Sequence, residues 1–183
     1  MALTATLYRF ALQLSDVDRG IYEALDLRLA RHPSETERFL LLRLIAYGLR
    51  YDEGLSFSKG GLSSTEEPAL AIRTPTGEMV EWIEVGSPSA ERVHRAAKAC
   101  PQVKIFTAAE QPLLEQAARS GALFAPQRVE VVFIAPELLD AMIPLLDRHT
   151  TLELTHSDGR LYVSLAGQHF EGDVRTWRLA AAP

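Results

Sequence analysis

Residues 78–107, EMVEWIEVGSPSAERVHRAAKACPQVKIFT, decide the fold of this chain. The first eight residues alternate between two faces up to Val85, which is the pattern of a β-strand that ends at the following glycine. Ser87-Pro88-Ser89 then opens a helix, because proline suits the first helical turn. After Pro101, residues 103–107 form a second strand. A strand, a helix and a strand in succession predict a mixed α/β fold.

The segment before this region predicts an antiparallel strand pair and a buried helix. Residues 4–14 and 25–30 alternate around a polar turn, which is typical of two paired strands. Ser34 stands three residues before Glu37, and this spacing predicts a capping box at the start of a helix that runs to about residue 51. Apolar side chains cover most of the circumference of that helix and leave a narrow polar edge of Thr36, Arg43 and Arg50, so it should be mostly buried.

The remaining segments are predicted in the same way. Residues 52–67 are rich in glycine and serine and predict a loop. Pro144 is expected to bend or shorten the helix in which it lies. The other predicted elements are strands at 68–74, 129–134 and 174–179, helices at 111–120 and 138–148, and a hairpin over 152–165. No linker interrupts the pattern, so we predict one domain over residues 1–183, with a mixed sheet, flanking helices and antiparallel edge strands.

The composition is that of an ordinary globular protein with a net charge of −5, 47 % hydrophobic and 23 % charged residues. The acidic balance argues against a global basic surface for nucleic acid or anionic membrane, although a local basic patch is compatible with it. The N-terminus has neither the basic start nor the long apolar stretch of a secretory signal. Cys100 is the single cysteine and lies on an apolar helix stripe, which predicts inert packing, and a lone cysteine is consistent with a reducing cytoplasm. No apolar run approaches the length of about 20 residues that spans a bilayer, so we expect no membrane association.

Several catalytic patterns are absent. Lys59 precedes Gly60 and Gly61, which is the reverse of the order in a nucleotide P-loop, and no dinucleotide fingerprint follows a strand. The five histidines have no metal-binding spacing, and there is no nucleophile elbow. Carboxylates are therefore the side chains that we expect to carry any catalysis or metal binding in this chain.

Three glutamates are candidates for such chemistry. Glu84 shares a strand face with Trp82 at the end of its strand, where a carboxylate is paired, metal-bound or shifted in pKa; the alternative is a solvated edge or a structural ion pair. Glu35 lies on the apolar stripe of the first helix and should point inward, unless it only offsets the helix dipole. Glu67 stands at a loop end, where Glu66 could serve as well.

One group of basic residues accompanies the strand that ends at Glu84. It comprises Arg92, Arg95, Lys98 and Lys104. Periodicity alone makes Lys98 a solvated side chain, but the clustering of positive charge in an acidic protein is a hint of an anionic partner.

The motifs together resemble the bacterial YaeQ family. They occur in order as Arg31-His32-Pro33-Ser34-Glu35, Lys59-Gly60, Glu67-Pro68, Gly77-Glu78, Trp82-Ile83-Glu84-Val85-Gly86 with Pro88, and Lys98-Ala99-Cys100. Members of that family are similar in fold to PD-(D/E)xK nucleases, in which acidic residues and a lysine surround a divalent metal. The likeness covers residues 3–107 and continues afterwards only as a hydrophobic pattern.

The resemblance implies a set of site residues. Glu67 and Glu84 would hold one Mg²⁺ or Mn²⁺ ion, with Glu35 as the acidic residue of the first helix. The lysine expected two residues after Glu84 is missing, because Gly86 stands there, and Lys98 could supply the ammonium from the next helix. Arg31, His32 and the loop over 58–64 could line the approach to the metal.

Two functions follow from this resemblance. The first is a metal-dependent phosphodiesterase of the nuclease type. The second is a non-catalytic binding module on the nuclease scaffold, acting through nucleic acid or a protein linked to transcription; the missing lysine and the acidic charge favour it. The inward Glu35 and the surroundings of Glu84 favour the first function. A purely structural protein is a third possibility. The sequence predicts no oligomeric state.

Overall fold

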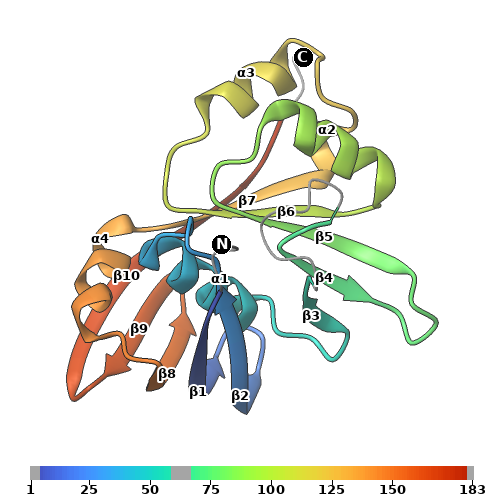
Figure 1. The fold of residues 1–183 in the computed structure, drawn as a ribbon. Coiled ribbons are helices and arrows are strands. Elements are labelled where there is room, and N and C mark those ends of the chain that lie inside the picture. Colours follow the sequence, from blue (N-terminus) through green and yellow to red (C-terminus); the bar gives the residue numbers. More distant parts are fainter. Residues whose placement is uncertain (1–4, 59–66, 181–183) are drawn as a thin grey trace. The chain divides into compact units, whose positions relative to one another are not determined.

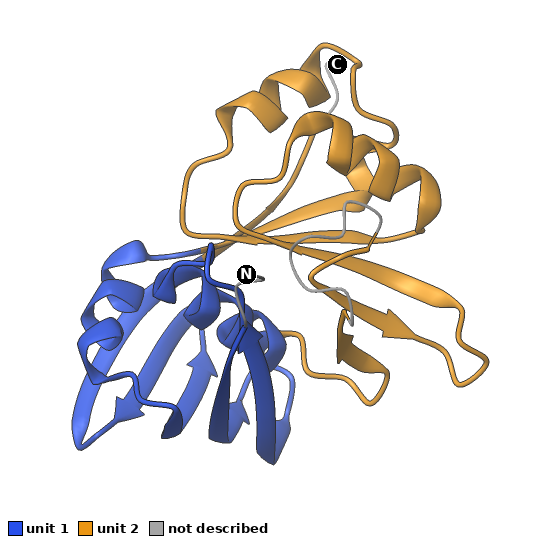
Figure 2. Ribbon diagram, viewed as in Figure 1, with its two compact units in different colours: residues 1–49, 134–174 blue, residues 50–133, 175–183 orange. Residues whose placement is uncertain are grey.

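The computed structural model describes residues 5–58 and 67–180, and the chain divides into two compact units. Unit 1 comprises residues 1–49 and 134–174, and unit 2 comprises residues 50–133 and 175–183 (Figure 2). Each unit therefore combines segments that are far apart in the sequence. The mixed α/β class is confirmed by the sheets and helices of both units, and one domain over the whole chain stays a prediction.

Unit 1 is built around a mixed sheet in the order β2-β1-β8-β9-β10 (Figure 1). Its elements are β1 (Thr6–Asp16), β2 (Ile21–Arg31), α1 (Glu37–Leu49), α4 (Pro136–Met142), the 3-10 helix η3 (Ile143–Leu145), β8 (His149–Ser157), β9 (Arg160–Leu165) and β10 (Gln168–Arg178), whose last residues belong to unit 2. β1 pairs with β2 in antiparallel and with β8 in parallel orientation. The predicted antiparallel pair at the N-terminus and the predicted C-terminal hairpin, β8 with β9, are both confirmed.

Helices α1 and α4 cover the same face of the unit 1 sheet (Figure 1). A Cβ atom added at Gly48 of α1 would lie 2.9 Å from a Leu154 side chain of β8, and one added at Gly172 of β10 would lie 2.9 Å from Leu138 of α4. These close approaches show that both helices pack tightly on the sheet. The predicted burial of the first helix is confirmed, since the side chains from Leu40 to Ala46 are all buried.

The predicted capping box at Ser34 is wrong. Helix α1 begins at Glu37, and its cap is Thr36, whose Oγ1 accepts a hydrogen bond from the Phe39 N–H at 3.2 Å. The Ser34 hydroxyl instead lies 2.6 Å from Nδ1 of His32. Glu37, expected to complete the box, forms an ion pair with Arg31 at 3.4 Å.

The sheet strands of unit 2 follow one another in the order β3-β4-β5-β6-β7. Its elements are β3 (Leu55–Phe57), β4 (Leu70–Arg73), β5 (Met79–Val85), α2 (Ala90–Ala99), β6 (Val103–Thr107), α3 (Pro112–Arg119), the 3-10 helix η2 (Pro126–Arg128) and β7 (Val129–Ile134). β3, β4 and β5 pair in antiparallel orientation, whereas β5, β6 and β7 are parallel. The end of β10 lies beside β7, because the Leu179 N–H donates to the Val129 carbonyl at 3.0 Å.

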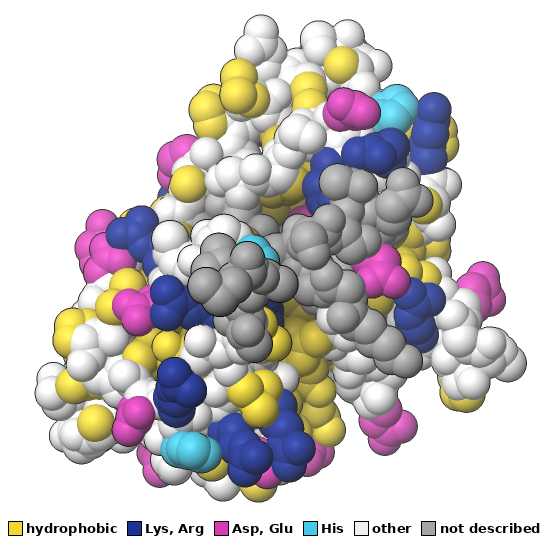
Figure 3. Space-filling model, viewed as in Figure 1, with side chains coloured by type: hydrophobic (Ala, Val, Ile, Leu, Met, Phe, Trp, Pro, Cys, Tyr) yellow, Lys and Arg dark blue, Asp and Glu magenta, His cyan; other side chains and the backbone are white. Residues whose placement is uncertain are grey.

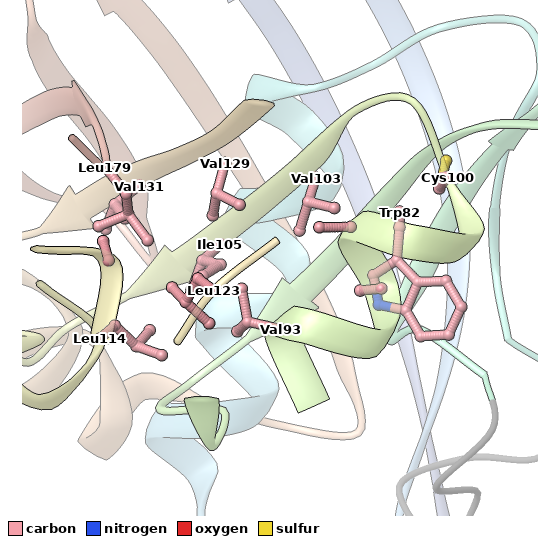
Figure 4. Packing of buried hydrophobic residues seen from close by; sticks show 13 residues of the cluster. Trp82, Val93, Cys100, Val103, Ile105, Leu114, Leu123, Val129, Val131 and Leu179 are labelled. Carbon is pink, nitrogen blue, oxygen red and sulfur yellow. The ribbon is translucent and has the colours of Figure 1, made fainter. Parts of the chain in front are cut away.

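The core of unit 2 lies between helices α2 and α3 and one face of this sheet (Figure 4). Trp82 of β5, Val93 of α2, Ile105 of β6 and Leu114 of α3 all belong to it. Cys100 is also part of the cluster and is 3 % exposed, and burial raises the pKa of its thiol. The prediction that Cys100 is a packing residue is therefore confirmed.

One strand was missed by the sequence analysis. β3 lies within the segment 52–67 that the glycine and serine content predicts to be a loop. Its position depends on Gly54, since a Cβ atom there would lie 2.3 Å from the Arg73 carbonyl oxygen. Because a three-residue strand is specified by pairing with a distant strand, its own sequence carries little signal.

The C-terminal predictions hold with shifted boundaries. Helix α4 ends at Met142, and Pro144 lies in the 3-10 turn that follows, as expected of an early break. The last strand begins at Gln168, six residues before the predicted start at Val174. In the part of the chain described here, no helix is long and apolar enough to cross a membrane.

Candidate functional site

The hairpin of β4 and β5 brings two of the predicted glutamates to one end of the unit 2 sheet. Leu70 of β4 pairs with Ile83 of β5 in antiparallel register. Glu67 lies three residues before Leu70, and Gly86 lies three residues after Ile83. In an antiparallel pair these offsets run to the same side, so Glu67 and the end of the Glu84 strand come to the same edge. This is also the carboxyl edge of the parallel strands, where α/β proteins bind ligands.

Glu84 is buried at this edge, with 4 % of the residue exposed. Its Oε1 accepts hydrogen bonds from the Trp82 indole N–H at 2.6 Å and from Nε of Arg92 at 2.7 Å. Burial raises the pKa of the Glu84 carboxyl above its ordinary value, and the hydrogen bonds and charge of Trp82 and Arg92 offset only part of that rise. Glu84 was predicted to be paired, metal-bound or shifted in pKa. Its carboxylate is paired with Arg92, and its pKa is raised.

Arg92 joins the two glutamates. It lies in the first turn of α2, which Ser89 caps by accepting the Arg92 backbone N–H at 3.2 Å. Its guanidinium donates to the Glu84 carboxylate and, through Nη2, to the Glu67 backbone carbonyl at 2.7 Å. The Glu67 carboxylate itself accepts a hydrogen bond from the Ser58 hydroxyl. One helix residue thus ties together the start of β4 and the end of β5.

Gly86 explains why no lysine follows Glu84. The backbone at Gly86 has a φ of 91°, and its N–H donates to the Phe106 carbonyl of β6 at 2.8 Å. This positive φ is accessible to glycine and strained for a residue with a side chain. A lysine at position 86 would therefore disturb the passage from β5 to α2.

Polar side chains continue along the same edge of the sheet. Gln111 is buried, and its Nε2 lies 2.9 Å from the Thr107 hydroxyl at the end of β6 and 3.1 Å from the Ser87 hydroxyl. These contacts link the segments that follow β5 and β6. The sequence did not predict Gln111 as part of this edge. The only indication in the sequence was that a polar residue stands directly before the α3 helix.

Lys98 lies away from this cluster of Glu84 and Arg92. It is exposed in the last turn of α2, six residues after Arg92, which corresponds to about 240° around the helix and about 9 Å along its axis. Among the residues that the structure describes, it forms no ion pair. The predicted role of Lys98 as the ammonium of the site stays a prediction.

Glu35, Arg31 and His32 come together in unit 1. Glu35 is 4 % exposed, as its predicted inward orientation requires, but it lies in the turn before α1 rather than on the helix. Its carboxylate accepts the His32 backbone N–H at 2.9 Å and pairs with Nη1 of Arg43 at 2.6 Å. Arg31 donates to the Glu35 carbonyl at 3.0 Å. Within unit 1 this carboxylate is neutralised by Arg43, which the sequence placed on the polar edge of the helix.

A second buried glutamate of β5 was missed. Glu81 is 2 % exposed and lies on the strand face opposite Glu84. It pairs with Arg50 at 2.7 Å and lies 3.8 Å from Nζ of Lys104, which also pairs with Glu130 at 2.7 Å. The available signal was its alternation with Ile83 and Val85, which placed a carboxylate on an apolar face.

The four basic residues predicted as a group do not form one uncompensated positive patch. Arg92 is held by Glu84 and Lys104 by Glu130, on opposite faces of the unit 2 sheet. Basic and acidic side chains are also interspersed over the molecular face in view in Figure 3.

The carboxylates at this edge bear on the predicted binding of a divalent cation. Over residues 5–58 and 67–180, no group of three or more His, Cys, Asp or Glu side chains is arranged to hold a metal ion. At Glu84, Oε1 accepts two hydrogen bonds, one of them from a guanidinium. A metal ion at Glu84 would have to compete with the Arg92 guanidinium for this carboxylate, and the predicted Mg²⁺ or Mn²⁺ site stays a prediction. The predicted loop over 58–64 lies outside the described residues from position 59 onward.

Comparison with known proteins establishes the family. The family model described as "YaeQ protein" matches residues 1–174. The chain belongs to the YaeQ family. It is 33 % identical to the YaeQ proteins of Salmonella typhi and Escherichia coli K12, both described as uncharacterized, over 97 % of this chain and 98 % of each relative.

Solved structures of the YaeQ family have the same fold. The crystal structure of YaeQ from Pseudomonas syringae superimposes with a TM-score of 0.84 at 30 % identity, over 94 % of this chain and 95 % of that one. YaeQ from Xanthomonas axonopodis pv. citri gives a TM-score of 0.83 at 30 % identity, over 98 % and 100 % of the two chains. The family resemblance drawn from the sequence motifs is therefore confirmed.

Proposed function

We propose that this YaeQ family member is a nucleic-acid-binding protein on a PD-(D/E)xK nuclease-like scaffold whose acidic edge no longer cuts phosphodiesters. The single observation that carries the proposal is the ion pair of Arg92 with Glu84, at 2.7 Å, continued to the Glu67 carbonyl. The nuclease-like core, with antiparallel strands at its edges, is part of the proposal. We also place the protein in the cytoplasm, where Cys100 stays reduced.

The charge balance at Glu84 supports binding without cleavage. In a metal-dependent nuclease the carboxylates must be free to face a cation that polarises the phosphate. Here the Arg92 guanidinium supplies that positive charge, and it donates hydrogen bonds to the Glu84 carboxylate and to the Glu67 carbonyl. The glycine at position 86 removes the ammonium that would steady the attacking water.

A second candidate function is a metal-dependent phosphodiesterase. The observation that favours it is the meeting of Glu67 and Glu84 at one sheet edge, with Glu84 in the desolvated state common at functional sites. Glu67 and Glu84 would hold Mg²⁺ or Mn²⁺ once Arg92, whose side chain is 21 % exposed, has moved away from Glu84. Glu35 and Lys98 would be auxiliary groups in this second candidate.

Thermal unfolding with and without metal separates the two candidates. A cation present at 100 times its dissociation constant stabilises the folded protein by about 2.7 kcal/mol. Under our proposal, neither Mg²⁺ nor Mn²⁺ raises the Tm of the wild-type chain, and a labelled single-stranded oligonucleotide stays intact. A metal-dependent rise in Tm together with cleavage, both lost in Glu84→Gln, would establish the phosphodiesterase instead.

Arg92→Gln is the sharper variant. If the guanidinium excludes metal, this variant exposes Glu84 to solution, and Mn²⁺ should then raise its Tm although it does not raise that of the wild type. Arg95→Gln, on the same helix with the same change of charge, is the matched control and should not respond to Mn²⁺. A wild type that already responds to Mn²⁺ as strongly as Arg92→Gln would contradict the proposed role of the ion pair.

A further inference from the structure

The outer face of the unit 1 sheet is lined by regular cross-strand rows of exposed side chains. Helices α1 and α4 cover the other face, and the alternating burial along β1 shows that its odd-numbered residues point outward up to Gln13. Arg9 of β1 lies directly opposite Arg28 of β2 and beside His149 of β8, and all three are exposed. We call these three residues the arginine row.

A second row crosses the same face at its other end. Ser15 of β1 lies opposite Tyr22 of β2 and beside Thr155 of β8, which in turn lies opposite Tyr162 of β9. Tyr22 is 63 % exposed and Tyr162 is 42 % exposed. The two rows are six residues apart along β1, or about 20 Å at the rise of a strand.

A hollow lies beside the second row. Its volume is about 480 Å³, and it is formed by side chains of β8, β9 and β10: Glu153, Thr155, Tyr162, Val163, Ser164, His169, Phe170 and Glu171. It therefore combines an aromatic ring with several hydrogen-bonding groups at an open surface. An unstacked nucleobase needs this combination, a ring to stack on and polar groups that reach its edge.

In the part of the chain that the structure describes, the two arginines of the arginine row have no acidic side chain paired with them. Like charges directly opposite each other on paired strands destabilise a sheet. Nevertheless, within the described part of the chain neither Arg9 nor Arg28 forms an ion pair, and Asp26 on the same face of β2 pairs with neither. A chain of net charge −5 has carboxylates to spare for such positions. Two unpaired guanidiniums at this spacing, with an imidazole beside them, fit an anion that carries repeated phosphates.

We propose that this outer face binds single-stranded nucleic acid, with phosphates on the arginine row and bases stacked on Tyr162 at the hollow and on Tyr22 in the same cross-strand row. Single strands are favoured over duplex because stacking on exposed rings requires unpaired bases, and β-sheets with exposed aromatics provide such platforms. The inference rests on the proposed function only for the class of ligand. Its residues all belong to unit 1, whereas Glu84 and Arg92 belong to unit 2.

The carboxylates of the hollow add a base preference. Glu171 is paired with Arg160 at 3.1 Å, which leaves Glu153 as the carboxylate of the hollow that can accept a hydrogen bond from a base. A carboxylate accepts from the amino group of cytosine. Oligo-dC should therefore bind more tightly than oligo-dT of the same length.

The test is fluorescence anisotropy of a labelled single-stranded oligo-dC with the full-length chain, without metal and over a range of salt concentrations. The double variant Arg9→Gln/Arg28→Gln should lose about tenfold in affinity at low salt, and the slope of log K against log salt should fall by about 1.4 for two lost phosphate contacts. Tyr162→Leu should also weaken binding, and Tyr162→Phe should retain it. The matched control is Arg95→Gln/Arg119→Gln, two exposed arginines of unit 2 with the same total change of charge.

Several outcomes would overturn the inference. No oligonucleotide binding at any salt concentration would do so, as would equal losses in the arginine-row variant and its control. So would a change of oligomeric state in Arg9→Gln/Arg28→Gln without nucleic-acid binding, because the face would then be a protein interface. Binding that is lost in Arg92→Gln but unaffected at Arg9 and Arg28 would move the surface to unit 2 and leave the proposed function standing. Binding lost at the arginine row, together with cleavage lost at Glu84, would overturn the proposed function alone.

Discussion

Each unit of this protein contains a buried glutamate paired with an arginine, and the two pairs are built differently. Glu35 and Arg43 lie 2.6 Å apart in unit 1, with side chains 0 % and 9 % exposed. Glu84 and Arg92 lie 2.7 Å apart in unit 2, with side chains 5 % and 21 % exposed. The first pair joins a turn to the helix that directly follows it, eight residues away. The second pair also reaches the start of a strand 25 residues back, through the Glu67 carbonyl.

The two carboxylates differ in their hydrogen bonds and in the effect of burial, and this difference indicates the role of each pair. The Glu35 carboxylate receives a backbone N–H as well as a guanidinium, so its hydrogen bonds hold one local turn in place. Glu84 stands at the carboxyl edge of the parallel strands, and burial raises the pKa of its carboxyl even with Arg92 beside it. A carboxylate whose burial outweighs its pairing is poorly placed for stability alone. We therefore assign the unit 1 pair to local folding and expect the unit 2 pair to contribute less to stability.

The largest effect is expected from breaking the unit 1 pair. Arg43→Met leaves the Glu35 carboxylate buried without its counter-charge, and the loss of one partner of a buried pair costs about 3–5 kcal/mol. Denaturant unfolding followed by circular dichroism measures this cost as a fall in the midpoint. The control is Arg38→Met, which breaks an ion pair with Asp140 of the same length, 2.6 Å, on an exposed surface. That change should cost at most about 1 kcal/mol, and similar losses in both variants would contradict the assignment.

A smaller loss is expected from breaking the unit 2 pair. Arg92→Gln should lower the free energy of unfolding by about 1–3 kcal/mol, because water can reach the partly exposed side of the pair and Trp82 still donates to Glu84. The same denaturant titration measures the loss. A cost above that of Arg43→Met would mean that the edge is the main structural support, and the contrast between the units would be lost.

The pH dependence of stability sharpens the comparison further. A carboxyl whose pKa is raised in the folded state binds its proton more tightly there than in the unfolded chain. The stability contributed by protonated Glu84 is therefore complete below its ordinary value of 4.5 and is lost as the pH rises through the raised pKa. Glu84→Gln removes this dependence. The difference in unfolding free energy, wild type minus variant, should thus decrease from pH 4 to pH 7, and an increase with pH would show that Arg92 dominates.

The sequence predicted most of what local patterns encode. The start of α2 followed from Ser87-Pro88-Ser89, the strand β7 from a β-branched run, and the burial of Glu35 from its place beside the apolar stripe of α1. Each of these features depends on residues within one or two helical turns.

What the sequence missed depends on contacts between one element and another, whether neighbouring or distant along the chain. The sequence placed Arg43 on a polar helix edge. Helical periodicity does not show that its side chain reaches the buried Glu35 carboxylate in the turn before the helix. β3 exists through its pairing with β4, and Arg92 acquires its role only when β4 and β5 meet in register. Tertiary pairing, rather than local propensity, decided all three.

The smallest effect concerns the starts of the helices that carry these arginines. Thr36 caps α1 and Ser89 caps α2, each through a side-chain oxygen that accepts a backbone N–H at 3.2 Å. Thr36→Val and Ser89→Ala should each cost about 1 kcal/mol in unfolding free energy. Ser34→Ala is the informative comparison. If Ser34 formed the predicted capping box, its loss would lower the unfolding free energy by a similar amount. If Ser34 only makes its exposed contact with His32, the loss should stay within about 0.5 kcal/mol. If Ser34→Ala cost as much as Thr36→Val, α1 would begin in solution where the sequence pattern placed it, and Glu35 would lie in the first turn of the helix instead of the turn that precedes it.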